Sequence, residues 1–155
     1  MKLILACDPN GGIGYKNKLP WSKIQGDLPR FKTLTTCENV VMGHNTWKSL
    51  PKKPLPNRYN FVITSNVSKL NANTEFTTLE NFLKLSKGIL DRTWIIGGAK
   101  LVDSCWHHIT EIHLTKTFTE YTCDTFISLL ELENNFVMES SEPFSDHCYQ
   151  IWKRK

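Results

Sequence analysis

The sequence lacks the patterns that mark several common classes of protein. No stretch approaches the roughly 18 consecutive apolar residues of a transmembrane helix, so we expect no membrane span. The five cysteines are odd in number, widely scattered and without a CxxC pair: Cys7, Cys37, Cys105, Cys123 and Cys148. This spacing argues against a disulfide framework or a zinc site, and it predicts reduced thiols in a cytoplasmic protein without bound metal.

Nucleophile and metal signatures are also missing. The histidines form no HExxH and no triad-like context. Gly97-Gly98-Ala99-Lys100 continues to Val102, so the GxGxxG fingerprint is absent. The net charge of +4 fits an enzyme for anionic ligands and permits nucleic-acid contact only weakly. Because no aromatic-rich RNA motif is visible, nucleic acid is not expected as a partner.

What is present predicts a single α/β domain over residues 1–155. Strand-like and helix-like segments alternate, which favours a central mixed, mostly parallel β-sheet of about eight strands flanked by about four helices. The apolar run Leu3–Cys7 is typical of a strand buried on both faces, and we prefer this interpretation to a signal peptide. Asp8–Ser22 is rich in glycine and proline and too long for a routine connection, so it is a candidate functional loop.

The remaining elements follow from periodicity and from capping residues. Further strands are predicted at Val40–Gly43, Tyr59–Ser65, Trp94–Ile96 and Glu111–Phe118, with a closing hairpin of Phe136–Met138 and Tyr149–Lys153. Helices are predicted at Gln25–Thr36, Asn45–Leu50, Leu79–Ser86 (with Thr78 as N-cap) and Ala99–Trp106.

Asp27 lies on an apolar stripe of the first predicted helix. Ile24, Leu28, Phe31 and Leu34 form that stripe at helical spacing. A carboxylate on a core-facing stripe loses hydration, which makes it a candidate for catalysis or ligand binding. Asp27 could equally be an N-cap or a first-turn residue, since Pro29 is welcome there. The segment alone leaves both interpretations open.

Three further positions carry weaker signals. Gly97-Gly98 lies between an apolar run and a helix, where it fits either a tight turn or a phosphate site. Gly43-His44-Asn45-Thr46 offers a second place where backbone N–H groups could face a diphosphate. Arg58 follows a proline-rich stretch and could grip a carboxylate, although a lone loop arginine is usually solvated.

Taken in order along the chain, these segments resemble dihydrofolate reductase. The matching motifs are Ile13-Gly14, Leu19-Pro20-Trp21, Asp27-Leu28, Phe31-Lys32, Val41-Met42-Gly43, Thr46-Trp47, Pro54-Leu55-Pro56-Asn57-Arg58, Ile96-Gly97-Gly98, Leu114-Thr115 and Asp124-Thr125-Phe126. The resemblance implies an NADPH-dependent oxidoreductase that transfers hydride to 7,8-dihydrofolate and so supports one-carbon metabolism and thymidylate synthesis. It also implies an adenosine-binding subregion over roughly residues 39–88.

The resemblance assigns a catalytic and a substrate-binding set. Asp27 would bind the 2-amino and N3 edge of the pterin and assist protonation at N5, with Thr115 hydrogen-bonded to its carboxylate and Trp21 in the mobile lid Gly14–Trp21. Arg58 would pair with the glutamate α-carboxylate of the substrate. The substrate site as a whole would comprise Leu5, Cys7, Asp27, Leu28, Phe31, Lys32, Leu50, Leu55, Arg58 and Ile96.

The same resemblance places the cofactor and implies a cis peptide at Gly97-Gly98. The NADPH contacts would be Cys7, Ile13, Gly14, Leu19, Gly43, His44, Asn45, Thr46, Thr64, Ser65, Ile96, Gly97, Gly98, Ala99, Lys100 and Leu101. Two positions depart from the family pattern. His44 stands where an arginine commonly grips the 2′-phosphate, and Val102 stands where a tyrosine is usual near the nicotinamide. With Lys100 and Ser65 still present, we favour NADPH over NADH.

Two other functions are compatible with parts of the pattern. A pyrimidine reductase of riboflavin synthesis would share the fold, but Asp27 and Arg58 suit a pterin and a glutamate tail better. A non-catalytic nucleotide- or RNA-binding module would not oxidise NADPH when dihydrofolate is added. We expect a monomer with small-molecule ligands.

Overall fold

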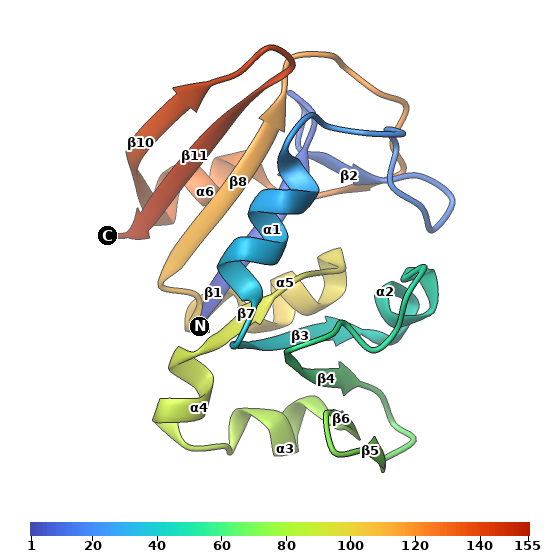
Figure 1. Ribbon diagram of the computed structural model, residues 1–155. Helices are drawn as coiled ribbons and strands as arrows, with labels where there is room; N and C mark the ends of the chain where they lie inside the picture. The colour runs from blue at the N-terminus through green and yellow to red at the C-terminus, as the bar shows by residue number, and fades with distance from the viewer.

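The computed structural model describes the backbone of residues 1–155 and every side chain except those of residues 69–71. A central nine-stranded sheet crosses the molecule in the order β10-β11-β8-β1-β7-β3-β4-β6-β5 (Figure 1). Its strands are β1 (Lys2–Cys7), β3 (Asn39–Gly43), β4 (Tyr59–Ile63), β5 (Ser68–Asn71), β6 (Thr74–Thr77), β7 (Thr93–Ile95), β8 (Glu111–Thr117), β10 (Phe136–Pro143) and β11 (His147–Arg154). A separate small sheet pairs β2 (Gly12–Gly14) with β9 (Thr125–Phe126).

The direction of the strands confirms the predicted mixed, mostly parallel sheet. Every neighbouring pair from β8 through β6 is parallel. At the two ends, β11 pairs antiparallel with β8, β10 with β11, and β5 with β6. The main sheet has nine strands where about eight were expected, because the hairpin of β5 and β6 was not foreseen.

Helices cover both faces of this sheet (Figure 1). They are α1 (Asp27–Thr35), α2 (His44–Ser49), α3 (Leu79–Leu83), α4 (Lys87–Asp91), α5 (Ala99–Cys105) and α6 (Leu129–Asn135), with a 3-10 turn at Trp106–His108. Successive strand residues point to opposite faces, so Val41 packs in one core cluster with Ile95, and Val40 packs in the other with Trp94. Burial on both faces explains the continuous apolar runs of β3 and β7.

Local backbone chemistry explains where two predicted helices differ from the observed ones. The helix expected at Gln25–Thr36 begins only at Asp27, because Gly26 precedes it in the left-handed region at φ 81°. The helix expected at Leu79–Ser86 is two short helices. Thr78 is confirmed as the N-cap of α3 and accepts from the Asn81 amide at 3.1 Å, while Ser86 caps α4 in the same way.

The sequence pattern missed elements that bury little. In α6 only Leu132 is buried, so this short helix of seven residues gives no clear apolar stripe. Strand β10 runs to Pro143 rather than to Met138. Of its residues only Phe136 is buried, so the alternation that marks a strand is absent. None of the described helices has the length and apolar character that a bilayer crossing requires.

Candidate functional site

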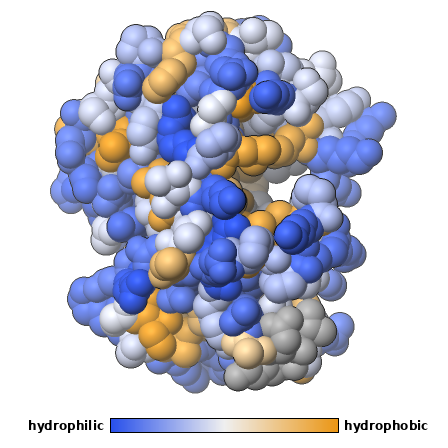
Figure 2. Space-filling view, viewed as in Figure 1, coloured by the Kyte–Doolittle hydropathy of each residue, from blue (hydrophilic) through white to orange (hydrophobic). Residues whose placement is uncertain are grey.

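The carboxyl ends of β1, β3 and β7 meet at one edge of the sheet, where open α/β folds usually bind ligands. The Gly43 amide donates to the Gly97 carbonyl at 2.9 Å, which joins the end of β3 to the residues after β7. The peptide bond between Gly97 and Gly98 is cis, which confirms that expectation. Figure 2 shows the surface hollowed beside this edge, between α1, α2 and the segment that carries β2, with apolar residues around the hollow.

Asp27 lies at the start of α1, beside this cleft. Its Oδ1 accepts a hydrogen bond of 2.7 Å from the hydroxyl of Thr115, which is buried in β8 and far away in the sequence. The N-cap position belongs to Gly26, and no side chain caps the helix. Asp27 is therefore a first-turn residue whose side chain is turned toward the sheet. The capping interpretation is wrong, while the predicted pairing with Thr115 is confirmed.

The apolar stripe around Asp27 is only partly a core stripe. Ile24 is buried, and Leu34 packs against the cluster that contains Trp47. Leu28 is 70% exposed, so the expectation that the whole stripe faces the core is wrong. A large exposed leucine next to a carboxylate is suited to a flat, partly apolar ligand.

Arg58 is buried rather than solvated, with 7% of its surface exposed. Its Nε donates to the Pro56 carbonyl at 2.9 Å, and its Nη1 donates to the Thr35 hydroxyl at 3.1 Å. Burial lowers the pKa of this guanidinium, although an arginine remains protonated. None of the described carboxylates pairs with it. A guanidinium that is held in place, partly desolvated and without a counterion is suited to bind the carboxylate of a ligand.

Other predicted substrate residues form the apolar wall of the site. Leu5, Leu50, Leu55 and Ile96 are half-buried and pack against the two core clusters. Cys7 is fully buried, and desolvation raises its pKa to about 12. Cys7 is thus an inert thiol that exposes no surface to the site, and it is not a nucleophile. On α1, Phe31 is half-buried beneath the Arg58 guanidinium, and Lys32 is exposed at the rim.

Many of the predicted cofactor residues lie in the first turns of α2 and α5, and Thr46 lies beside the cis peptide. His44, Asn45 and Thr46 form the first turn of α2, and Ala99, Lys100 and Leu101 form the first turn of α5. Neither helix has a side-chain cap, so its first N–H groups are free of side-chain acceptors. A Cβ at Gly97 or Gly98 would lie 3.6 Å from the Thr46 hydroxyl, in ordinary contact. Thr64 and Ser65 follow β4, with Ser65 exposed.

The dihydrofolate reductase family model matches residues 1–152, almost the whole chain. The chain belongs to the dihydrofolate reductase family. It is accordingly an NADPH-dependent oxidoreductase. The pyrimidine reductase and the non-catalytic binding module receive no support from this match.

Individual relatives agree with the family. The chain is 32% identical over 160 residues to dihydrofolate reductase type 8 of Escherichia coli, covering 98% of this chain and 94% of that protein. It is 38% identical over 132 residues to a bifunctional dihydrofolate reductase-thymidylate synthase of Paramecium tetraurelia, which covers 81% of this chain but 28% of that protein. Among solved structures, a dihydrofolate reductase from Enterococcus faecalis, complexed with NADP(H) and RAB-propyl, superposes with a TM-score of 0.84 at 25% identity. That match covers 99% of this chain and 95% of the other.

Two departures from the dihydrofolate reductase pattern have different surroundings. His44 is exposed at the start of α2, with its ring 6.5 Å from the ring of Phe76 and in an edge-on orientation. Val102 is 1% exposed and packs in the core beneath α5. The first position is therefore open to a ligand, whereas Val102 belongs to the packing under the helix.

The segment predicted to be the lid, Gly14–Trp21, is held at both ends. Its last residue, Trp21, is buried and packs edge-on against Tyr121 with ring centroids 5.6 Å apart, and Ile13, just before the segment, is also buried. Leu19, by contrast, is 63% exposed at the tip. The Lys16 amide donates to the Asp124 carboxylate at 2.9 Å, and the Asp124 amide donates back to the Gly14 carbonyl. Strand β2 thus stays paired with β9.

Sequence analysis missed Asp8, which joins the lid to the neighbouring loop. Its Oδ1 accepts from the amides of Asn10 (2.9 Å) and Gly12 (2.8 Å), and its Oδ2 accepts from the amide of Tyr121 (3.1 Å). The side chain is 1% exposed. An aspartate directly after a buried strand and before Pro9-Asn10-Gly11-Gly12 is a signal for such a turn. That signal is local, and the bond to Tyr121 could not be read from it.

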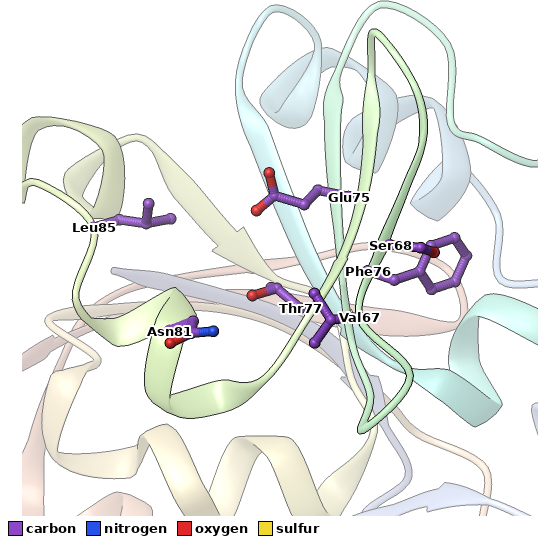
Figure 3. Close-up of a pocket in the computed structure, with 7 residues that line it drawn as sticks. All are labelled: Val67, Ser68, Glu75, Phe76, Thr77, Asn81 and Leu85. Atoms are coloured by element: carbon purple, nitrogen blue, oxygen red, sulfur yellow. The ribbon is translucent and has the colours of Figure 1, made fainter.

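A further cavity lies elsewhere. It has a volume of about 390 Å³ beside β6, α3 and the segment before β5, and Figure 3 shows Val67 and Thr77 close together in it with Leu85 set apart. Among its described lining side chains the one charged group is Glu75. A lining whose one described charge is negative does not favour a phosphate, so we place neither the substrate nor the cofactor phosphates there.

Proposed function

We propose that Asp27, positioned by Thr115, is the acidic residue that binds and activates dihydrofolate for reduction to tetrahydrofolate. The observation that carries this assignment is the 2.7 Å bond between a buried hydroxyl and a carboxylate at the mouth of an apolar cleft. With Oδ1 held by Thr115, Oδ2 is left to face a ligand. A carboxylate in this position can accept two N–H groups from the edge of a pterin and favour the protonated ring, with the proton relayed to N5 through water.

The residues beyond the cis peptide fit a dinucleotide. Gly97 and Gly98 present backbone without side chains, and the uncapped first turns of α2 and α5 offer N–H groups for a diphosphate. When bound, NADPH supplies the hydride. The chain's own contribution is to stack two flat rings in the cleft, orient them, and exclude water with the lid over Gly14 to Trp21.

A spectrophotometric assay tests the reaction and the cofactor together. We expect the purified protein to oxidise NADPH only when dihydrofolate is added, and to do so faster than with NADH. A rate of NADPH oxidation that does not depend on dihydrofolate would contradict the proposed substrate. Equal rates with NADH at the same concentration would contradict the proposed preference for the 2′-phosphate.

Replacing Arg58 by methionine is expected to raise KM for dihydrofolate about tenfold or more and to change kcat little. The guanidinium lies away from the reacting ring, so it contributes binding that is equal in the ground and transition states. The comparison is made by steady-state kinetics. Arg92→Met is the matched control, since Arg92 is an exposed arginine paired with Glu38. A fall in kcat without a change in KM would contradict this role.

Replacing His44 by arginine is expected to increase the preference for NADPH over NADH about tenfold at neutral pH. A neutral imidazole holds a phosphate weakly, whereas a guanidinium adds a charge-assisted hydrogen bond. Ratios of kcat/KM for the two cofactors, measured for both proteins, check this expectation. An unchanged ratio in His44→Arg would place the 2′-phosphate elsewhere.

We propose a monomer that works in the reducing cytoplasm, with small molecules as its ligands. All five cysteines are free, and two of them, Cys7 and Cys105, are buried. This arrangement supports a reducing compartment, because no disulfide contributes to the fold. Light scattering of the reduced protein tests the oligomeric state. A mass of twice the chain would contradict the monomer.

A further inference from the structure

Behind Asp27 lies a cluster of polar side chains that the mechanism above does not use. Arg30 follows Asp27 by less than one helical turn, and its Nη1 donates to the Thr115 hydroxyl oxygen at 3.2 Å. Its Nη2 lies 3.1 Å from Nε2 of His147, the first residue of β11. The guanidinium carbon is 4.1 Å from the ring centroid of Tyr149 and 5.0 Å from that of Phe144. The cluster joins α1 to β8 and to the turn between β10 and β11.

The chemistry of the donors fixes the direction of every hydrogen bond in this cluster. A guanidinium has no acceptor, so the Thr115 oxygen accepts from Arg30 and its own hydrogen goes to Asp27. Without Arg30 the hydroxyl would be free to rotate among other acceptors. Arg30 therefore determines the orientation in which Thr115 holds the carboxylate.

The same argument fixes the state of His147. Because Nε2 must accept from Arg30, it carries no proton, and Nδ1–H donates to the Asp146 carboxylate at 2.6 Å. The amide of Gln25 and the imidazole of His147 hold the pKa of Asp146 below its ordinary value, so this acceptor is ionised at neutral pH. His147 is thus neutral, in one defined tautomer.

Because the contact between Arg30 and His147 is buried, a positive charge on His147 would be unfavourable there. The His147 side chain is fully buried and stacks on Phe144, with centroids 4.8 Å apart and planes 7° from parallel. The charged groups that face it are Arg30 from α1 and Asp146 from its own turn, and β8 contributes the uncharged Thr117 as its strand partner. A proton on Nε2 would remove the acceptor for Arg30 and place two cations in contact away from water.

We propose that Arg30 is a positioning residue for hydride transfer, held in place by neutral His147 and acting on Asp27 through the Thr115 hydroxyl. This inference rests on the proposed role of Asp27. A purely structural alternative is that the cluster only fastens the β10–β11 turn to α1. The positioning role predicts that a variant of Arg30 slows hydride transfer even when its stability is unchanged, whereas the purely structural role predicts no such effect.

Arg30→Met tests the first link. It keeps much of the apolar stem and removes the donors, so we expect the single-turnover rate of hydride transfer to fall about tenfold or more, because a misplaced catalytic group is costly. The KM for NADPH should stay unchanged, and Arg30→Lys should recover part of the rate by restoring one donor. Arg92→Met is the matched control. Arg30→Met with the rate of the unaltered protein would overturn the inference, as would a loss that Arg30→Lys leaves fully in place.

His147→Gln tests the second link. Glutamine can accept from Arg30 and donate to Asp146, whereas the side chain in His147→Phe can do neither. We expect the glutamine variant to retain far more activity than the phenylalanine variant. Equal losses in both variants would overturn this part.

Asp27→Asn distinguishes a failure of the inference about Arg30 from a failure of the proposed function of Asp27. If Asp27→Asn is as active as the unaltered protein, the proposed function of Asp27 fails, and the inference fails with it. If Asp27→Asn loses activity while Arg30→Met does not, only the inference fails. Thermal unfolding of each variant shows whether a lost rate follows from lost structure.

Discussion

Asp27→Asn is expected to lower turnover at neutral pH by about a hundredfold to ten-thousandfold, the usual range for a general acid or base. Asparagine has the same shape, and its carbonyl can still accept from the Thr115 hydroxyl, so the local structure should persist. The amide cannot carry the negative charge that favours a protonated pterin. Lowering the pH should restore part of the rate, because protons then come from the solvent. Steady-state turnover across pH checks this expectation.

A matched variant and a binding measurement sharpen this test. Asp91→Asn removes a carboxylate from α4, where Asp91 pairs with Lys87 at 2.6 Å on the surface. We expect its activity to equal that of the unaltered protein. Cofactor affinity, measured by fluorescence, should change little in Asp27→Asn, because Asp27 lies on the substrate side of the cis peptide. Full activity in Asp27→Asn at neutral pH would contradict the assignment of the acid.

Asp8→Ala is expected to lower the free energy of unfolding by about 3 kcal/mol, or the melting temperature by about 10 °C for a domain of this size. The carboxylate accepts from three backbone amides, those of Asn10, Gly12 and Tyr121. Alanine leaves these N–H groups unpaired at a buried position, and each unpaired group carries a desolvation cost. Denaturant unfolding of the two proteins gives the difference directly.

The lid supplies its own control for this prediction. Asp124 also accepts a backbone amide from the lid, that of Lys16, but this bond is exposed to solvent. Asp124→Ala should therefore cost less than about 1 kcal/mol, since water can replace the lost acceptor. Equal losses for Asp8→Ala and Asp124→Ala would show that burial of the Asp8 carboxylate does not matter for stability.

The parallel centre of the sheet could be predicted from the composition of its strands. Leu3, Val41 and Ile95 lie in continuous apolar runs. Exposing such runs to water is unfavourable, so the sequence predicts both their burial and their strand conformation. Helix α6 could not be predicted, because it buries only Leu132 and depends on a single cap, Ser128.

Some residues of the site could also be predicted from the sequence, and others could not. Asp27, Thr115 and Arg58 were predicted by resemblance, and the structure places Asp27 against Thr115. Arg30, His147 and Asp8 were missed, because their partners lie far away in the sequence and only tertiary packing brings them together. Leu28 is exposed although it lies on the same stripe as the buried Ile24, because helical periodicity predicts the face of a residue but not how much of that face the rest of the protein covers.

A crystal structure of the complex with NADPH and folate would test the central claim most directly. The account predicts that the Asp27 carboxylate accepts hydrogen bonds from the N3 and 2-amino edge of the pterin while Thr115 still donates to it. The nicotinamide should stack on the pterin beside Gly97-Gly98. A pterin bound with that edge away from Asp27, or Asp27 turned into solvent, would contradict the account.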